Sequence, residues 1–340
     1  MILVHVVLPG DIDDPAHPSG GNTYDRRVCD GLRALGWSVL EHAVPGSWPR
    51  PTSVDTGGLR GVLAECPENA LVLIDGLIAS CVPEVLVPQA TRLRLAILVH
   101  LPLENDREGE ALAAAHGVVT TSEWTHGRLL DLYSLSPERI HVAAPGVDSM
   151  PLAPGSPSGQ ELLCVGPVTV HKGHDVLASA LNMIADLSWN CVWVGGLTRE
   201  PELVRELTRT LPANVHLTGP LTRQALNAAY ARADLLVLAS RGETYGMVVT
   251  EALAHGIPVL ASDAKGIPEA MGFAPDGNRP GLLTEPGDPA ALAAALRDWL
   301  TDADLRERLR AAARSRRQSL TRWDDTVARV AKVLEGMRAA

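Results

Sequence analysis

The chain has 340 residues, enough for two domains of ordinary size, and its 46% hydrophobic and 21% charged residues are typical of a soluble globular enzyme. A formal net charge of -10 argues against a nucleic-acid partner, and no segment reaches the roughly 18 apolar residues of a membrane helix. The five cysteines are far apart and form no C-x-x-C pair, so we expect neither disulfides nor a structural zinc.

The N-terminus begins directly with an apolar run and has no basic leader, which predicts a cytoplasmic protein. Residues 1–8 are predicted to form a central parallel strand, buried on both faces. A long loop rich in Pro, Gly and Asp follows, and a helix is expected from about Asn22 to Gly36. Gly20 and Gly21 stand at the entrance of this helix, where the backbone can approach a ligand closely. A metal at Asp11-Ile12-Asp13 is a weaker alternative to simple turn formation.

Apolar runs at 38–44, 70–74, 94–99 and 117–120 complete a first doubly wound α/β domain, which we place at residues 1–149. His100 follows the third of these runs, at the sheet edge where ligands bind, and could donate a hydrogen bond to a sugar hydroxyl. A satisfied core histidine is the alternative. Residues 150–160 are rich in Pro, Gly and Ser without periodicity, which indicates an interdomain linker.

A second α/β domain is predicted over residues 161–320. Its first strand, 161–165, ends at Gly166, and Lys172 comes just before the next helix, where its charge would add to the free backbone amides. Runs at 191–194, 215–218, 234–238, 258–261 and 281–284 extend the sheet. Residues 321–340 form an amphipathic helix that docks on either the first or the second domain.

The stretch 235–268 is predicted to be a βαβ unit whose polar loop carries Arg241 and Glu243. Gly246 and Met247 would offer free backbone N–H groups at the start of the helix, and Glu251 lies in its second turn. Carboxylates on both sides of an anion site suit a ligand with phosphates in its middle and hydroxyls at both ends. A nucleotide diphosphate sugar has this pattern.

These motifs resemble the signature of the retaining glycosyltransferases of family 4, which have the GT-B fold. The matching residues are Glu243, Thr244-Tyr245-Gly246-Met247, Glu251-Ala252, Gly256-Ile257-Pro258-Val259 and Gly266-Ile267-Pro268-Glu269. The resemblance implies two Rossmann-like domains that face a central cleft, with the acceptor on the first domain and the donor on the second. It also implies transfer of a hexose from a UDP or GDP sugar to a small-molecule or glycan acceptor, with retention and with neither a metal nor a cofactor.

The same resemblance assigns roles to individual residues. The catalytic group would be Glu243, Lys172, His100 and Arg241; the donor site Gly166, Lys172, Leu221, Glu243, Thr244, Tyr245, Gly246, Met247, Val248 and Glu251; and the acceptor and phosphate loop Gly20 and Gly21. Pro167 stands where the family has a phosphate-binding arginine, and we expect Arg241 to replace it beside Lys172. The alternatives are a nucleotide-sugar epimerase or hydrolase of the same fold and a catalytically idle sugar-nucleotide binder.

Overall fold

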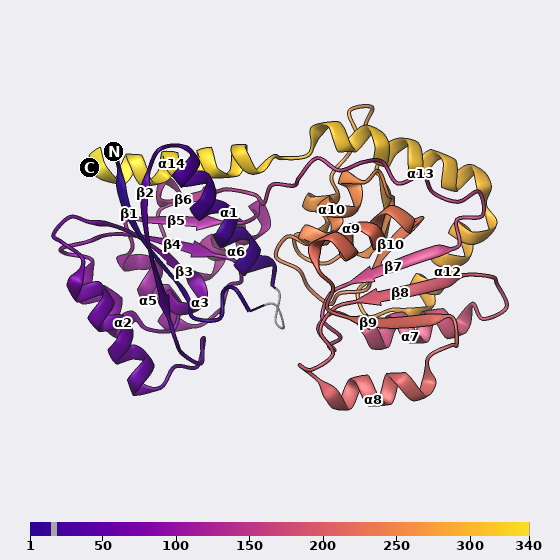
Figure 1. The fold of residues 1–340 in the computed structure, drawn as a ribbon, viewed down its shortest axis with the longest axis horizontal. Coiled ribbons are helices and arrows are strands. Elements are labelled where there is room, and N and C mark those ends of the chain that lie inside the picture. The colour runs from indigo at the N-terminus through magenta and orange to yellow at the C-terminus, as the bar shows by residue number, and fades with distance from the viewer. Residues whose placement is uncertain (15–18, 340) are drawn as a thin grey trace. The chain divides into compact units, whose positions relative to one another are not determined.

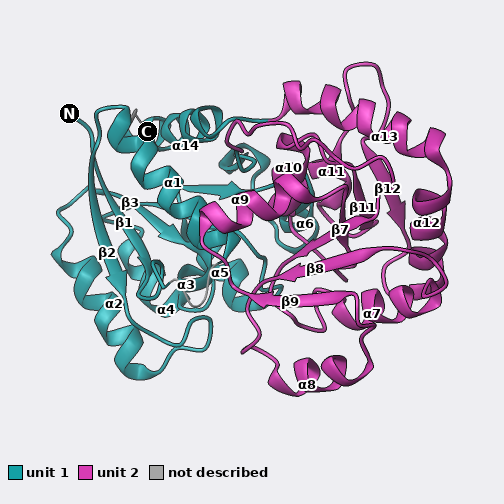
Figure 2. Cartoon of the chain, turned by 45° about the vertical axis from the view of Figure 1, so that its right-hand side comes forward, with its two compact units in different colours: residues 1–146, 321–340 teal, residues 147–320 magenta. Residues whose placement is uncertain are grey.

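A computed structural model describes residues 1–14 and 19–339, which divide into two units (Figures 1 and 2). Unit 1 comprises Met1–Gly146 and Thr321–Ala340, and unit 2 comprises Val147–Leu320. Residues 15–18, in the predicted acceptor loop, and residue 340 lie outside the described residues. No helix in the described part of the chain is both long and apolar enough to cross a membrane.

Unit 1 contains a six-stranded parallel sheet in the order β2-β1-β3-β4-β5-β6. Its strands are β1 (Leu3–Pro9), β2 (Ser38–Val44), β3 (Leu71–Asp75), β4 (Arg94–Val99), β5 (Gly117–Thr120) and β6 (Ile140–Val142). Alternate residues of β1 belong to two separate apolar clusters, with Val7 in one and Val6 and Leu8 in the other. The strand is thus buried on both faces, as its apolar sequence predicts.

The helices of unit 1 are α1 (Gly20–Ala34), α2 (Ser53–Glu65), α3 (Gly76–Ala79), α4 (Pro83–Leu86), α5 (Asp106–Ala114), α6 (Glu123–Leu132) and α14 (Trp323–Ala339). Helix α1 begins two residues before the predicted Asn22, because the Ser19 hydroxyl accepts the Asn22 N–H at 3.0 Å and caps the helix there. Gly20 and Gly21 are therefore its first two residues and not part of the preceding loop.

The C-terminal helix α14 packs within unit 1. Its buried residues Val327, Val330 and Leu334 share an apolar cluster with Tyr24 and Leu32 of α1, and Figure 1 shows α14 running beside that helix. The apolar stripe read from the sequence thus covers the sheet of the first unit. The spacing of three and four positions between Val327, Val330 and Leu334 places them on one helical face.

Unit 2 contains a second six-stranded parallel sheet, in the order β12-β11-β10-β7-β8-β9. Its strands are β7 (Glu161–Val165), β8 (Asn190–Val194), β9 (Val215–Gly219), β10 (Leu235–Leu238), β11 (Val259–Ser262) and β12 (Gly281–Thr284). Its helices are α7 (His174–Met183), α8 (Pro201–Thr210), α9 (Arg223–Arg232), α10 (Met247–Ala254), α11 (Ile267–Met271), α12 (Pro289–Thr301) and α13 (Ala303–Arg316). The predicted class, two doubly wound parallel sheets, is confirmed.

Residues 150–160, predicted as a linker, are held by unit 2. The Ala153 N–H donates to the carbonyl of His255 at 2.8 Å, and the Trp299 indole N–H donates to the carbonyl of Gly159 at 2.7 Å. The Ser156 N–H and hydroxyl both donate to the buried carboxylate of Asp234. A Pro-, Gly- and Ser-rich composition fits this path along unit 2 as well as it fits a free linker.

Candidate functional site

The start of helix α10 is open. Its N-cap is Gly246 at φ +93°, and no side chain caps its first amides. Side chains of Ser, Thr, Asn or Asp cap α1, α2, α5, α6, α9, α12 and α13. The first backbone N–H groups of α10, which include those of Met247 and Val248, therefore have no side-chain cap at the positive end of the helix dipole. This geometry makes an anion site.

An ion pair lies in the loops at the same sheet edge. The Lys172 ammonium is 2.6 Å from Oε1 of Glu243, and the Ser240 hydroxyl donates to the same oxygen at 2.7 Å. The two strands that carry these loops, β7 and β10, are neighbours in the sheet. The Lys172 and Glu243 side chains have 25% and 12% of their surface exposed to solvent, so the pair is accessible to a ligand. The structure thus brings together two residues that the sequence placed 71 positions apart.

Arg241, predicted to bind the diphosphate beside Lys172, forms an ion pair in this structure. Its guanidinium forms a bidentate pair with Asp175, at 2.8 and 2.7 Å, and also donates to the carbonyl of Val170. Asp175 lies in the first turn of α7, where its carboxylate also accepts from backbone N–H groups, and its pKa is lowered mainly by Arg241. The charge of Arg241 is therefore matched by a carboxylate, and its contacts join the two loops that carry Lys172 and Glu243.

The other predicted donor residues surround this pair in different ways. Gly166 lies beside the aliphatic part of Lys172, since a Cβ there would be 3.8 Å from Cδ of the lysine. Tyr245 is buried, whereas Thr244 and Val248 are half-buried. Leu221 is half-buried and follows β9, which lies two strands from β7. It shares the sheet edge with the ion pair.

Glu251 lies in α10 and is half-buried. The Tyr230 hydroxyl donates to its Oε2 at 2.8 Å, and burial raises the pKa of the carboxyl. The Tyr230 ring in turn stacks on His255, with ring centroids 5.2 Å apart. One carboxyl oxygen of Glu251 is thus already used, and Oε1 is the atom that can accept from a ligand hydroxyl.

Lys265 is a residue that the sequence interpretation missed. It follows β11 at φ +53°, and its Cε lies 3.0 Å from the position that a Cβ on Gly242 would take. His171 approaches the same glycine, at 3.6 Å. A left-handed backbone conformation is uncommon for lysine, so the loop after β11 must hold Lys265 in this conformation through its own contacts. The position of Lys265 just before Gly266 is a signal that the sequence did contain.

His100 follows β4 at the carboxyl edge of the sheet of unit 1. Its Nε2 is 2.8 Å from Oδ1 of Asp25 and 3.6 Å from Oδ2 of Asp75. A Cβ on Gly21 would lie 3.3 Å from Cδ2 of the imidazole, so the glycine packs closely against the ring. The structure therefore places His100 and the two predicted glycines, Gly20 and Gly21, around the first turns of α1. Neither Asp25 nor Asp75 was identified from the sequence.

A second cluster in unit 1 combines residue types that can bind metals. His5 Nδ1 is 3.0 Å from His42 Nε2 and 3.5 Å from Cys66 Sγ. Burial lowers the pKa of both imidazoles, and the His42 charge further lowers that of His5. A hydrogen bond between two neutral imidazoles accounts for the short contact between the rings.

Known proteins resemble this chain in sequence. Residues 159–302 match the family model described as glycosyl transferases group 1. A D-inositol 3-phosphate glycosyltransferase of Catenulispora acidiphila is 30% identical over 333 residues, which cover 84% of this chain and 77% of that protein. Its counterpart from Jonesia denitrificans is 32% identical over 248 residues, 66% of this chain and 57% of that protein. The chain thus spans little more than half the length of this relative.

Solved structures resemble the fold over its whole length. Sucrose-phosphate synthase from Thermosynechococcus elongatus matches with a TM-score of 0.77 and 21% identity, covering 100% of both chains. Anabaena HepE, solved in complex with UDP-glucose, matches with a TM-score of 0.74 and 18% identity, covering 99% of this chain and 100% of HepE. These similarities confirm the predicted GT-B fold.

Proposed function

This chain belongs to the group 1 glycosyltransferases, and we propose that it transfers a hexose from a nucleotide diphosphate sugar to an acceptor hydroxyl with retention of configuration. The observation that carries the proposal is the accessible Lys172–Glu243 pair at the edge where α10 presents uncapped amides. A lysine and a helix N-terminus together suit a diphosphate, and a carboxylate beside them suits sugar hydroxyls.

Several of the predicted donor residues then have distinct tasks. The Lys172 ammonium and the Met247 and Val248 amides bind the diphosphate and stabilise the charge that grows on it as the sugar leaves. Glu243 accepts hydrogen bonds from hydroxyls of the sugar, and Oε1 of Glu251 accepts from the ribose. Arg241, through Asp175, holds the Lys172 loop in place.

The reaction replaces one bond at the anomeric carbon with another on the same face of the sugar. The bond to the diphosphate oxygen breaks, a bond to the acceptor oxygen forms, and the acceptor proton passes to the departing phosphate. The positive charge of the oxocarbenium-like transition state lies close to the leaving phosphate, which is therefore the group to stabilise. In this scheme neither a metal nor a cofactor takes part.

The acceptor is suggested by the names of the relatives, several of which are D-inositol 3-phosphate glycosyltransferases. An inositol phosphate is therefore the first acceptor to test, with UDP, GDP and ADP sugars as donors. Acceptor-dependent release of nucleotide supports transfer. Donor conversion without an acceptor would favour an epimerase or hydrolase, and tight binding without turnover an idle binder. The anomeric configuration of the product, read by NMR, tests retention.

Variants of the ion pair test the assignment of the donor site. Lys172→Ala removes a charge-assisted contact worth about 1.5–3 kcal/mol, so the affinity for the nucleoside diphosphate should fall about 10- to 150-fold. The exposed Lys332 of unit 1 provides a matched control, since Lys332→Ala makes the same charge change away from the site. A loss within about twofold for Lys172→Ala would contradict the proposal.

Glu243→Ala separates sugar contacts from nucleotide contacts. We expect it to lower the rate of transfer far more than it weakens binding of the nucleoside diphosphate, because its partner in the reaction is the sugar. Calorimetry with the nucleoside diphosphate and steady-state rates with the nucleotide sugar measure the two quantities. Equal losses in both would place Glu243 in the nucleotide pocket.

A further inference from the structure

Three polar side chains from separate elements of unit 1 meet at the carboxyl edge of its sheet. Asp25 comes from α1, Asp75 is the last residue of β3, and His100 directly follows β4. Asp25 and Asp75 are 2% and 5% exposed, whereas 18% of the side-chain surface of His100 is exposed to solvent. The carboxyl groups are therefore inside the unit, and the imidazole connects them to its surface.

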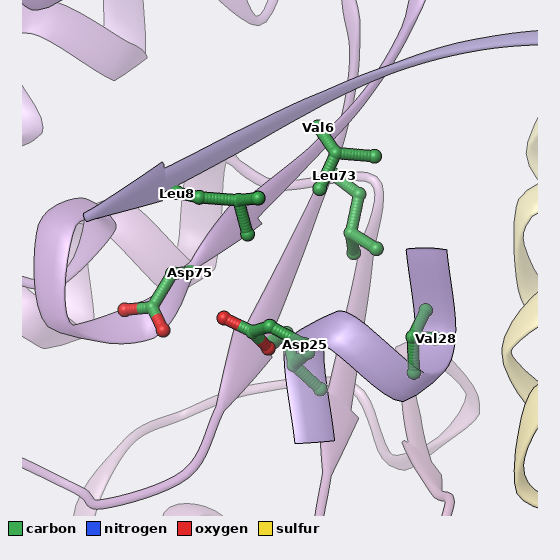
Figure 3. Close-up of a pocket in the computed structure, with 7 residues that line it drawn as sticks. Val6, Leu8, Asp25, Val28, Leu73 and Asp75 are labelled. Atoms are coloured by element: carbon green, nitrogen blue, oxygen red, sulfur yellow. The ribbon is translucent and has the colours of Figure 1, made fainter. Parts of the chain in front are cut away.

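The surroundings of the two carboxyl groups are apolar. Asp25 and Asp75 line a small cavity whose other walls are side chains of Val6, Leu8, Val28, Leu73 and Leu98, and which has no room for a water molecule. Figure 3 shows the two carboxyl groups side by side, one from α1 and one from the end of β3. Two neighbouring carboxyl groups that are shielded from water cannot both be ionised, because burial and the repulsion of like charges both disfavour the second charge.

The hydrogen bonds of the pair show where one proton belongs. Asp75 Oδ1 accepts the Leu77 N–H at 2.6 Å, and Asp25 Oδ1 faces His100, but Asp25 Oδ2 is buried and has no conventional partner in the described part of the chain. A proton on Asp75 supplies the missing donor. Burial and the nearby charge of Asp25 raise the pKa of Asp75 to about 7, which fits this placement.

The imidazole of His100 is held on several sides. A Cβ on Gly21 would lie 3.3 Å from its Cδ2, and the Tyr24 ring meets it edge-on with centroids 5.2 Å apart. Its Nε2 faces Asp25, while its Nδ1 has no partner among the residues that the structure describes. The ring thus has one nitrogen anchored in the interior and the other available to a ligand.

We propose that Asp25 and Asp75 act as one carboxyl pair, sharing a single proton, which positions His100 through its Nε2–H and keeps it a hydrogen-bond donor at Nδ1 rather than a base. Asp75 carries the proton, and its O–H donates a hydrogen bond to Oδ2 of Asp25. Asp25 remains charged and accepts the Nε2–H of the imidazolium. The Nδ1–H then faces a sugar or acceptor hydroxyl, a role that rests on the proposed glycosyl transfer.

The charges around the ring agree with this state. Burial by itself would lower the pKa of His100, but the charge and hydrogen bond of Asp25, together with Asp75, raise it above its ordinary value. Tyr24 is a further titratable side chain in contact with the ring, and burial raises the pKa of its hydroxyl well above the usual range. Its hydroxyl donates to the carbonyl of Ala143 at 2.8 Å, so it stays neutral.

The proposal distinguishes the two aspartates, because an asparagine reproduces a protonated carboxyl but not a charged one. In Asp75→Asn, Oδ1 can still accept the Leu77 N–H and the amide can still donate to Asp25. In Asp25→Asn the charge moves to Asp75, whose Oδ2 is 3.6 Å from the imidazole Nε2 and not 2.8 Å. The Asp25→Asn/Asp75→Asn double variant leaves a buried imidazole with no carboxylate.

The test is NMR titration of His100 in the full chain, with labelled histidine and with the signal assigned by its loss in His100→Asn. We expect its pKa to stay within about half a unit in Asp75→Asn, to fall by about one unit or more in Asp25→Asn, and to fall furthest in the double variant. Equal falls in the two single variants, or none in Asp25→Asn, would overturn the proposal. If Asp25→Asn fails to fold, a fall of one unit or more in the pKa of His100 in Asp75→Asn would by itself overturn the proposal.

Two further measurements separate this proposal from others. With an active donor and acceptor, Asp25→Asn should lower kcat at least tenfold with the donor KM within twofold, and it should lower kcat at least threefold more than Asp75→Asn does. Because the titration needs no turnover, it stands even if no sugar is transferred. Elemental analysis and titration with Zn²⁺ and Mn²⁺ should find no bound metal that depends on Asp25. One metal ion per chain, lost in Asp25→Asn, would overturn the proton-sharing pair.

Discussion

Replacing Gly173 tests how closely the backbone of the Lys172 loop packs against the residue that follows β10. Gly173 is the N-cap of α7 at φ +69°, and a Cβ there would lie 1.9 Å from the carbonyl oxygen of Ala239, just beyond β10. Gly173→Ala therefore combines two costs. A left-handed alanine costs about 1–2 kcal/mol, and the overlap with Ala239 costs about 1–3 kcal/mol more.

Gly277→Ala is the matched control for this variant. Gly277 belongs to the same unit and has φ +83°, but a Cβ there meets nothing within 4 Å, so only the left-handed term of about 1–2 kcal/mol applies. Urea unfolding followed by tryptophan fluorescence gives both free energies. We expect Gly173→Ala to lose at least about 1 kcal/mol more than the control and to weaken nucleotide binding as well. Equal losses would refute the close packing of this loop.

Three other variants test separate contacts. Burial lowers the pKa of His174 to about 4. The contribution of the neutral imidazole to stability is therefore complete above pH 6.5 and is lost as the pH falls toward 4. Between pH 7 and 4.5 the free energy of unfolding should drop about 2–3 kcal/mol more in the native chain than in His174→Asn. Arg241→Ala breaks an exposed pair with Asp175 worth about 1 kcal/mol or less and should change the nucleotide Kd less than threefold; a tenfold loss would make Arg241 a direct diphosphate ligand. Gly21→Ala puts a Cβ 3.3 Å from His100, so it should shift the imidazole NMR signals and lower turnover with nucleotide affinity unchanged, whereas unchanged signals would contradict the packing.

Elements whose signals are local were predictable from the sequence. The stretch 235–268 contains β10, α10 and β11 with bounds close to those predicted, because short apolar runs and glycines define each end. The pairing of Lys172 with Glu243 was also accessible, since both follow strands that end at one sheet edge. The start of α1 was placed two residues late because Ser19, which caps it, stands before two glycines that resemble a turn.

Contacts between distant elements could not be predicted in the same way. Asp175 lies 66 residues from Arg241, and nothing in its own segment shows that it will bind that guanidinium. Asp75 carried a usable signal, since it is a charged residue at the end of an apolar strand. Asp25 carried almost none, because an aspartate inside an amphipathic helix is ordinarily exposed. Its burial became visible only once β3 and β4 were placed beside α1.

The two units present different chemistry at their sheet edges, and this difference bears on the ligands of the proposed reaction. In unit 2 an ammonium and uncapped amides gather at α10, which attracts phosphate. In unit 1 Ser19 already occupies an amide of α1, and in the proposed state the charge of His100 is matched by the carboxylate of Asp25. His100 can still donate one hydrogen bond from Nδ1, which suits a hydroxyl. If the proposed function is correct, the diphosphate binds to unit 2, and unit 1 contributes hydrogen bonds to hydroxyl groups at this edge.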